Sequence, residues 1–284
     1  MMRKLVDYIK QSLLGALQKR GWFRHSKEST SFLGATIFAT RGAFFRKYEK
    51  DDAWLYLLAR NHKNIVDVGC NIGQSSMLML IGTENRLICV DPNPRALSVC
   101  AENLIYNRLS TQVNFVNAFV GEEEGKEIEF FTIGAGAAGS MFSSFAKTAS
   151  RHKKSIYVKT RTLDSICKQS NFIPDLIKID VEGAEQFVLR GIGEFLLKNK
   201  PAIFVEMHSG EGLGIEENTS IVLGWCKQHA YQPFYLKNGT ILSDPTIVSR
   251  RGRYHLLLLA DGVHYPEYLK NVPENSTLSS LGLN

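Results

Sequence analysis

The chain has 284 residues, of which 44% are hydrophobic and 22% are charged. This ordinary globular composition excludes a fibrous or low-complexity chain and allows one large domain or two small ones. The formal net charge of +6 favours acidic partners such as phosphorylated substrates, anionic lipid headgroups or nucleic acid, although a merely soluble surface explains it equally well.

The cysteines lie far apart, without a CxxC pair or a Cys/His cluster at zinc spacing. Neither a disulfide framework nor a structural metal is therefore indicated, and we expect a reducing, cytoplasmic compartment. No stretch approaches the roughly 20 apolar residues of a membrane span, and residues 1–23 lack the apolar run and cleavage site of a secretory signal. We expect a soluble or peripheral protein.

Residues 1–50 are predicted to form an N-terminal helical extension. Leu5, Ile9, Leu13 and Leu17 recur every four residues among basic side chains, which is the pattern of an amphipathic helix within residues 1–23. This helix would pack onto the domain or a partner chain, or dock peripherally on a membrane surface.

From residue 51 to residue 261, short β-branched runs alternate with helical patterns, which predicts an α/β fold: a doubly wound, Rossmann-like, seven-stranded sheet. The sheet should be mostly parallel, with an antiparallel last strand at its edge. Strands are expected at residues 64–68, 87–90, 113–116, 175–179, 202–205, 233–236 and 254–259, and helices at 74–81, 94–107, 184–189 and 219–229.

An insertion at residues 121–163 interrupts this alternation. It contains two expected strands, 128–133 and 156–160, around a loop rich in glycine and serine at 134–144. Such a loop over a strand end is suited to be a lid or substrate wall. Residues 262–284 are expected to be an irregular tail.

The strongest local signal is the segment that follows the first strand of this domain. An apolar strand carrying Asp67 passes through a Gly-x-x-x-Gly turn, Gly69 to Gly73, and opens a helix. Main-chain amides at such a helix start can receive an anionic or polar ligand group. The turn is not the dinucleotide fingerprint, because Asn71 stands where its second glycine belongs. This disfavours an NAD-dependent dehydrogenase, and an adenosyl ligand with an amino-acid end fits better.

The next strand also ends in an acid, Asp91, which lies 22 residues after Gly69. That spacing suits a carboxylate that accepts hydrogen bonds from both ribose hydroxyls. Asn93 is expected to cap the following helix, leaving Asp91 free of that task. At the third strand end, Asn117 and Phe119 are placed to read and stack on an adenine.

The fourth and fifth strands bring further ionisable groups to the same edge. Strand parity places Lys178 and Asp180 on one face. A buried lysine needs a charged partner, and the neighbouring strands offer Asp67 and Glu206. Glu206 shares a face with His208, so acids and a histidine are expected to converge on one crevice.

These segments together resemble the FkbM family of S-adenosylmethionine (SAM)-dependent methyltransferases. The resemblance runs from about residue 65 to residue 208, through the Asp67–Gly73 turn, the strand end at Asp91, an Arg-Thr-Leu-Asp-Ser segment at 161–165, and the end of the fifth strand. Its most specific part is Lys-Ile-Asp-Val-Glu-Gly-Ala-Glu at 178–185. The resemblance implies the class I methyltransferase fold, SAM as cofactor with S-adenosylhomocysteine as product, and O-methylation of sugar hydroxyls in glycans or of secondary-metabolite hydroxyls.

An alcohol is a poor nucleophile until its proton is leaving, so a base is expected near the acceptor. We predict His208 in this role as neutral imidazole, with Asp180 and Glu182 as alternatives and Lys178 beside them. A divalent-metal site formed by Asp180, Glu206 and His208 is conceivable, but Lys178 on the same face disfavours a cation there, so no metal is assigned.

The acceptor is expected to be a sugar hydroxyl in a glycan or glycolipid, phosphorylated or lipid-linked, with a small-molecule hydroxyl as the alternative. Nucleic acid is disfavoured, because the chain has neither an Asn-Pro-Pro-Tyr-like motif nor a basic stripe interleaved with aromatic residues. The substrate is expected to contact Glu206, His208 and Ser140. The expected cofactor-binding residues are Asp67, Gly69, Asn71, Gly73, Gln74, Ser75, Asp91, Pro92, Asn93, Asn117, Ala118 and Asp180.

Overall fold

The protein is represented by a computed structural model, which describes residues 27–40, 51–132, 155–209 and 212–282. The amphipathic segment 1–23 and the glycine- and serine-rich loop 134–144 lie outside the described residues. Within the described part of the chain, no helix has both the length and the apolarity needed to cross a membrane.

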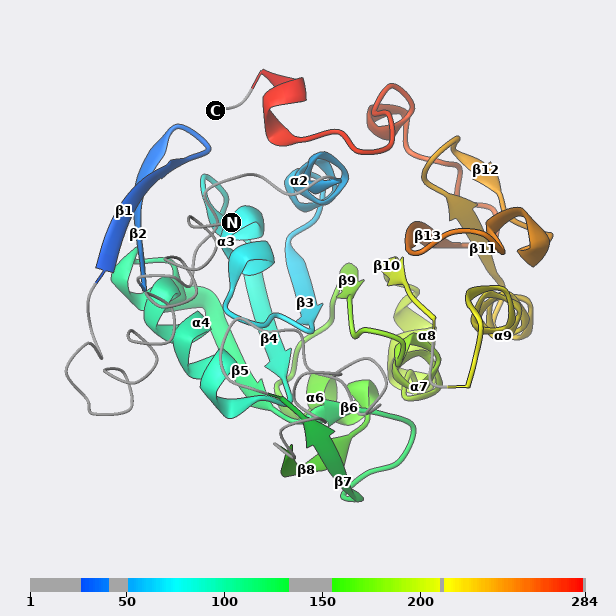
Figure 1. The fold of residues 1–284 in the computed structure, drawn as a ribbon, viewed down its shortest axis with the longest axis horizontal. Helices are drawn as coiled ribbons and strands as arrows, with labels where there is room; N and C mark the ends of the chain where they lie inside the picture. Colours follow the sequence, from blue (N-terminus) through cyan, green and yellow to red (C-terminus); the bar gives the residue numbers. More distant parts are fainter. Residues whose placement is uncertain (1–26, 41–50, 133–154, 210–211, 283–284) are drawn as a thin grey trace, which may run out of the picture.

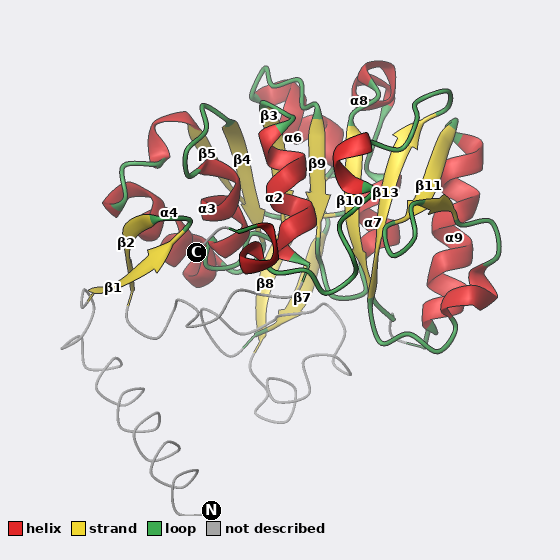
Figure 2. Cartoon of the chain, turned by 90° about the horizontal axis from the view of Figure 1, so that it is seen from above, coloured by secondary structure: helices red, strands yellow, loops and turns green. Residues whose placement is uncertain are grey.

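An eight-stranded sheet forms the centre of the molecule, in the order β12-β11-β13-β10-β9-β3-β4-β5 (Figure 2). The strands β10, β9, β3, β4 and β5 run parallel to one another. The strands are β3 (Asn64–Val68), β4 (Arg86–Asp91), β5 (Val113–Asn117), β9 (Leu176–Ile179), β10 (Ala202–Met207), β11 (Tyr231–Tyr235), β12 (Thr240–Ile241) and β13 (Tyr254–Ala260). The sequence-based prediction of a Rossmann-like α/β fold with a mostly parallel sheet is confirmed, and the two-residue β12 adds an eighth strand.

The last strand, β13, is antiparallel as predicted, but its predicted place at the edge is wrong. It pairs with β10 on one side and with β11 on the other. The reason is its composition, since Leu256, Leu257, Leu258 and Leu259 are all buried. A continuous apolar run suits a strand covered on both faces, whereas the edge is taken by the short, exposed β12.

Helices cover both faces of this sheet (Figure 1). One apolar cluster joins α2, α3 and α4 to the sheet through side chains such as Trp54 and Leu78. The other joins α6, α7, α8 and α9 through side chains such as Leu163 and Val222. The helices are α2 (Asp52–Arg60), α3 (Gln74–Leu80), α4 (Pro94–Tyr106), α6 (Leu163–Gln169), α7 (Glu185–Arg190), α8 (Glu194–Asn199) and α9 (Ile215–Gln228). This doubly wound arrangement leaves the carboxyl ends of the parallel strands at one edge.

The described part of the N-terminal extension is a β-hairpin, not the expected helix. Strands β1 (Lys27–Phe32) and β2 (Ala35–Thr40) pair antiparallel around Leu33 and Gly34, whose φ angles of 51° and 72° suit a two-residue hairpin turn. The hairpin lies beside α4 in Figure 1, where the main-chain N–H of Thr40 donates to Asn103 Oδ1 at 2.9 Å. The helical pattern in the sequence ends at residue 23, before this hairpin, so it does not justify the helical expectation for residues 27–40.

The described strands of the 121–163 insertion pair with β6, which lies just before it, to form a small second sheet in the order β6-β8-β7. The strands are β6 (Phe119–Val120), β7 (Glu127–Phe131) and β8 (Ser155–Arg161), so both strands expected in the insertion are present in its described part. Between β13 and residue 282, the described chain forms only the short 3₁₀ turns η3 (Glu267–Leu269) and η4 (Leu278–Leu281). It packs on α2, where Trp54 Nε1 donates to the Val272 carbonyl at 3.0 Å.

Candidate active site

The turn between β3 and α3 lies against the end of β9. Gly69 has a φ of +81°, and a Cβ built on it would be 1.9 Å from the main-chain oxygen of Asp180. Glycine is the residue that tolerates both this backbone conformation and this approach. At the other end of the turn, Gly73 packs in the same way on Cys100 of α4. The two glycines therefore fix how the turn sits between its neighbouring elements.

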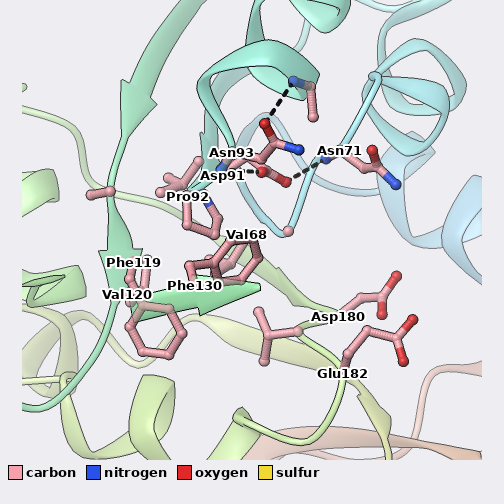
Figure 3. Close-up of a pocket in the computed structure, with 15 residues that line it drawn as sticks. Val68, Asn71, Asp91, Pro92, Asn93, Phe119, Val120, Phe130, Asp180 and Glu182 are labelled. Atoms are coloured by element: carbon pink, nitrogen blue, oxygen red, sulfur yellow. Dashed lines mark hydrogen bonds between the residues drawn. The ribbon is translucent and has the colours of Figure 1, made fainter. Parts of the chain in front are cut away.

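A first cavity, the β4 cavity, opens at this edge between the ends of β3, β4 and β9 (Figure 3). Asp91 lies on one side of it, and Asp180 and Glu182 lie on the other. Phe119 and Phe130 supply aromatic surface. The residues predicted for cofactor binding that line it are Gly69, Asn71, Asp91, Pro92, Asn93, Ala118 and Asp180.

Asp91 is held in place by main-chain donors. The N–H of Asn71 donates to its Oδ2 and the N–H of Asn93 donates to its Oδ1, both at 2.8 Å. Burial raises the pKa of Asp91 to about 6, against the opposing effect of these two hydrogen bonds. Each oxygen keeps a further acceptor position for a ligand hydroxyl.

Two neighbouring asparagines have mainly structural contacts. The Asn93 side chain caps α4 as predicted, accepting from the N–H groups of Arg95 and Ala96. Asn117 Nδ2 donates to the carbonyls of Asp91 and Pro92 at 2.9 and 3.0 Å. Asn117 lines neither this cavity nor its neighbour, so the structure does not place it against an adenine as expected.

A second cavity, the α2 cavity, shares Gly69, Asn71 and Asp180 with the first. Its wall also includes the predicted residues Gln74, Ser75, Lys178 and Glu206, together with Asp51, Phe204 and His255, which the sequence did not single out. Asn71 Oδ1 and Gln74 Oε1 are buried and have no hydrogen-bond partner among the described residues. Buried acceptors of this kind are normally satisfied, so both oxygens suit a donor group of a bound ligand.

Of the two partners expected for Lys178, Asp67 forms an ion pair with it, whereas Glu206 pairs with Arg253. Lys178 Nζ lies 3.1 Å from Asp67 Oδ1 and 3.4 Å from Asp180 Oδ2. Asp67 is fully buried, and its Oδ2 accepts from the hydroxyls of Ser75 and Ser76 at 2.8 and 2.7 Å. The expectation that Asp67 binds cofactor is therefore corrected: it anchors Lys178 and the start of α3.

Lys178 stays charged in this setting. Burial works against its charge, but Asp67 and Asp180 raise its pKa above the usual value. Lys178 Nζ also donates to the Gly69 carbonyl at 3.1 Å. The lysine thus ties the glycine turn to Asp180, which is a positioning role.

His208 sits among carboxylates. Its Nδ1 lies 3.0 Å from Glu185 Oε1, and its Nε2 lies 3.4 Å from Glu206 Oε1 and 3.8 Å from Glu182 Oε2. Burial opposes a charge on the ring, but the hydrogen bonds to Glu185 and Glu206 raise the pKa of His208 to about 11. Carboxylates face both ring nitrogens, so this arrangement favours the imidazolium over the neutral imidazole that we expected to act as base.

Glu185, which the sequence did not single out as functional, is the central hydrogen-bond acceptor of this network. It is fully buried and accepts from Asn218 Nδ2 at 3.0 Å and from the Gly183 N–H at 2.9 Å, in addition to its contact with His208. A buried carboxylate with these donors and a cation is electrostatically satisfied. Glu185 therefore holds His208 in place.

Glu182 differs from the other acids of the site. Its φ of 52° is a left-handed conformation for a non-glycine residue, a kind of strain that clusters at functional sites. Burial raises the pKa of Glu182, His208 lowers it, and the neighbouring acids, Asp180 first, raise it further. The net direction is upward, which makes Glu182 a better proton acceptor than an ordinary carboxylate.

Ligand atoms of Asp180, Glu182 and His208 lie within 4.8 Å of one another, close enough to share a cation. The metal group weighed from the sequence had Glu206 in place of Glu182. In the structure, Glu206 Oε1 instead accepts from Arg253 Nη1 at 2.7 Å, and Glu206 Oε2 lies 3.5 Å from His255 Nε2. The predicted substrate residue Ser140 lies outside the described residues.

The doubly wound sheet, the glycine turn and the acid at the end of the second parallel strand define a class of enzyme, the Rossmann-like SAM-dependent methyltransferases. The family model "Methyltransferase FkbM domain" matches residues 67–233, which is more than half of the chain. The protein therefore belongs to the FkbM methyltransferase family, as its sequence motifs predict, and that family implies SAM as the cofactor.

A curated relative is the 2-O-methyltransferase NoeI of Sinorhizobium fredii (strain NBRC 101917 / NGR234), 29% identical over 157 residues. The match covers 51% of this chain and 63% of that protein, less than two thirds of its length.

Solved structures with a similar arrangement include an FkbM methyltransferase from Methylobacillus flagellatus KT, with a TM-score of 0.49 and 15% identity over 75% of this chain and 48% of that chain. Another is TYW2 of M. jannaschii in complex with AdoMet, with a TM-score of 0.44 and 10% identity over 83% of this chain and 85% of that chain. At TM-scores below 0.5, these similarities carry no argument about ligands or substrates.

Proposed function

We propose that this enzyme transfers a methyl group from SAM to a hydroxyl oxygen of a sugar in a glycan or glycolipid. The observation that carries this proposal is the arrangement of acids around the glycine turn. Asp91 lies on one side of the β4 cavity, and Asp180 and Glu182 lie on the other. A cofactor bound across Gly69 would thus have a carboxylate that accepts hydrogen bonds from its ribose at one end and a carboxylate that accepts the substrate proton at the other.

The residues present fit SAM. The Asp91 carboxylate would accept hydrogen bonds from the ribose hydroxyls, and Phe119 and Phe130, which line the β4 cavity, would pack on the adenine. In the α2 cavity, the unsatisfied oxygens of Asn71 and Gln74 would accept hydrogen bonds from the ammonium of the amino-acid end. A Cβ on Gly69 would lie 1.9 Å from the main-chain oxygen of Asp180, so glycine is what lets the turn, and a cofactor bound across it, lie against the end of β9.

SAM, when bound, supplies an electrophilic methyl group, and the chain positions the acceptor and takes up its proton. In-line displacement requires the acceptor oxygen behind the methyl group, so positioning contributes much of the rate. We assign proton acceptance to Glu182, whose pKa is raised and which lines the β4 cavity. Protonated His208, 3.8 Å away, orients Glu182 and stabilises the negative charge of the site.

The chemistry of the α2 cavity supports a sugar as acceptor. Its wall carries Asp180, Glu206 and His255, which can bond to hydroxyl groups, and Phe204, whose ring stacks on that of His255. The relative NoeI is named a 2-O-methyltransferase, which is O-methylation at a defined position. A secondary-metabolite hydroxyl would be bound by the same groups and is the alternative that the assay distinguishes.

The test is methyl transfer from isotopically labelled SAM to a panel of neutral, phosphorylated and lipid-linked sugars and of phenolic or polyketide alcohols, with products identified by mass spectrometry. The proposal predicts labelled sugar ether and its loss in Glu182→Gln. The matched control Glu217→Gln, on the exposed first turn of α9, should keep full activity. Labelling confined to the non-sugar alcohols would overturn the sugar assignment.

The same assay run with a chelator tests the cation group. If Asp180, Glu182 and His208 act without a metal, activity is unchanged by chelator and by added Mg²⁺ or Mn²⁺. Activity lost in chelator and restored by the ion would replace proton acceptance by Glu182 with metal ligation.

We place the enzyme in the cytoplasm as part of this proposal, with peripheral membrane contact through residues 1–23. Binding of the purified protein to anionic vesicles at low salt would test that contact.

A further inference from the structure

Three of the five cysteines meet behind the glycine turn. Cys70 belongs to the turn itself, Cys89 to β4 and Cys100 to α4. Their Sγ atoms all lie within 4.8 Å of one another, and the residues are 1%, 0% and 0% exposed. The remaining cysteines, Cys167 of α6 and Cys226 of α9, are equally buried but belong to no such group among the described residues.

The cluster is joined to the cofactor turn on two sides. The Cβ of an alanine at Gly73 would lie 2.7 Å from Cys100 Sγ, so the α4 thiol is packed directly on the turn. Cys70 is also among the residues that line the α2 cavity, so the cluster lies directly behind the wall of that cavity.

We propose that Cys70, Cys89 and Cys100 form a binding site for a thiophilic d¹⁰ cation, Cu(I) or Zn(II). A trigonal site with metal–sulfur bonds of about 2.3 Å needs sulfurs about 4 Å apart. The sulfur separations of up to 4.8 Å meet this requirement after shifts of a few tenths of an ångström. Soft thiolates select Cu(I), Zn(II) and related ions over Mg²⁺ or Ca²⁺. Each coordinating thiol releases its proton to solvent when the ion binds.

The ligand number separates the two ions. Cu(I) accepts three sulfur ligands, whereas Zn(II) is almost always four-coordinate. A fourth ligand is at hand in the Ser76 hydroxyl, 3.3 Å from Cys89 Sγ, but this hydroxyl already donates to Asp67 at 2.7 Å. The structure thus favours Cu(I), and Zn(II) requires Ser76 to exchange partners.

The test uses the reduced full-length protein under anaerobic conditions, and it requires no methyltransferase activity. The protein is equilibrated with Cu(I) in a chelating competitor or, separately, with Zn(II) in a chromophoric competitor, and bound metal is measured after desalting. The disrupting variants are Cys89→Ser and Cys100→Ser, and the matched control is the double variant Cys167→Ser/Cys226→Ser. Circular dichroism checks that each variant is folded.

The proposal predicts one tightly bound ion per chain in the wild type and in the control. Affinity should fall roughly tenfold or more in the disrupting variants. The ion should also raise the midpoint of thermal unfolding in the wild type but not in Cys89→Ser, because it binds the folded state. Absence of both ions from the wild type, or equal loss in the control and the disrupting variants, would overturn the site. Loss of metal binding in Ser76→Ala would indicate the four-coordinate site that zinc needs. Unchanged metal binding in Ser76→Ala would indicate the three-coordinate copper site.

Discussion

Substitution of Gly69 by alanine should push the glycine turn away from Asp180 at the end of β9, and both line the cofactor cavity. The new Cβ would lie 1.9 Å from the Asp180 main-chain oxygen, and this contact must widen to at least 3.0 Å. The φ of +81° adds a conformational cost of about 1–2 kcal/mol for alanine. The forced displacement in a packed region adds about 1–3 kcal/mol. We therefore expect a total destabilisation of about 2–5 kcal/mol.

Gly125 provides the matched control. Its φ of +76° is nearly the same, but a Cβ built on it meets no atom within 4 Å. Gly125→Ala should therefore show only the conformational cost, about 1–2 kcal/mol. Urea unfolding measures both free energies, and calorimetry with SAM measures binding to the folded fraction. Equal destabilisation of the two variants, or wild-type SAM affinity in Gly69→Ala, would refute the reasoning from the close approach.

Glu182→Gln should lower kcat by about 10²–10⁴-fold while leaving SAM affinity unchanged, as measured by initial rates on an accepted sugar; an unaltered kcat would remove Glu182 as proton acceptor. His208→Asn should destabilise the fold by about 3–5 kcal/mol in urea unfolding, because it leaves Glu185 buried without its cation, and a change below 1 kcal/mol would contradict that pairing. SAM affinity should fall as pH drops below about 6, because the Asp91 carboxylate, which we propose binds the ribose hydroxyls, becomes protonated; calorimetry should show this pH dependence in the wild type and not in Asp91→Asn.

Much of the fold could be predicted because each strand carries its own local signal. Apolar β-branched runs mark the parallel strands, and the acids at positions 91 and 180 mark their carboxyl ends. The parity argument also found the pair Lys178–Asp67. The place of β13 between β10 and β11 could not be predicted, because periodicity does not specify which strands become neighbours.

Features that depend on contacts distant in sequence were missed for the same reason. The charge state of His208 depends on Glu185, which lies 23 residues away in the sequence. No sequence pattern indicates that these two residues are partners. The three cysteines at 70, 89 and 100 lack metal-site spacing and meet only because β3, β4 and α4 pack together. The hairpin at residues 27–40, in contrast, had a readable signal in its Leu33–Gly34 turn.

The most direct test of the central claim is calorimetric titration of the purified protein with SAM, S-adenosylhomocysteine and NADH, repeated on Asp91→Ala and on the exposed control Asp261→Ala. The account predicts that the two adenosyl ligands bind and NADH does not, that Asp91→Ala loses this binding, and that Asp261→Ala keeps it. Failure of the folded wild type to bind either adenosyl ligand, or undiminished binding by Asp91→Ala, would contradict the assignment of the cofactor cavity.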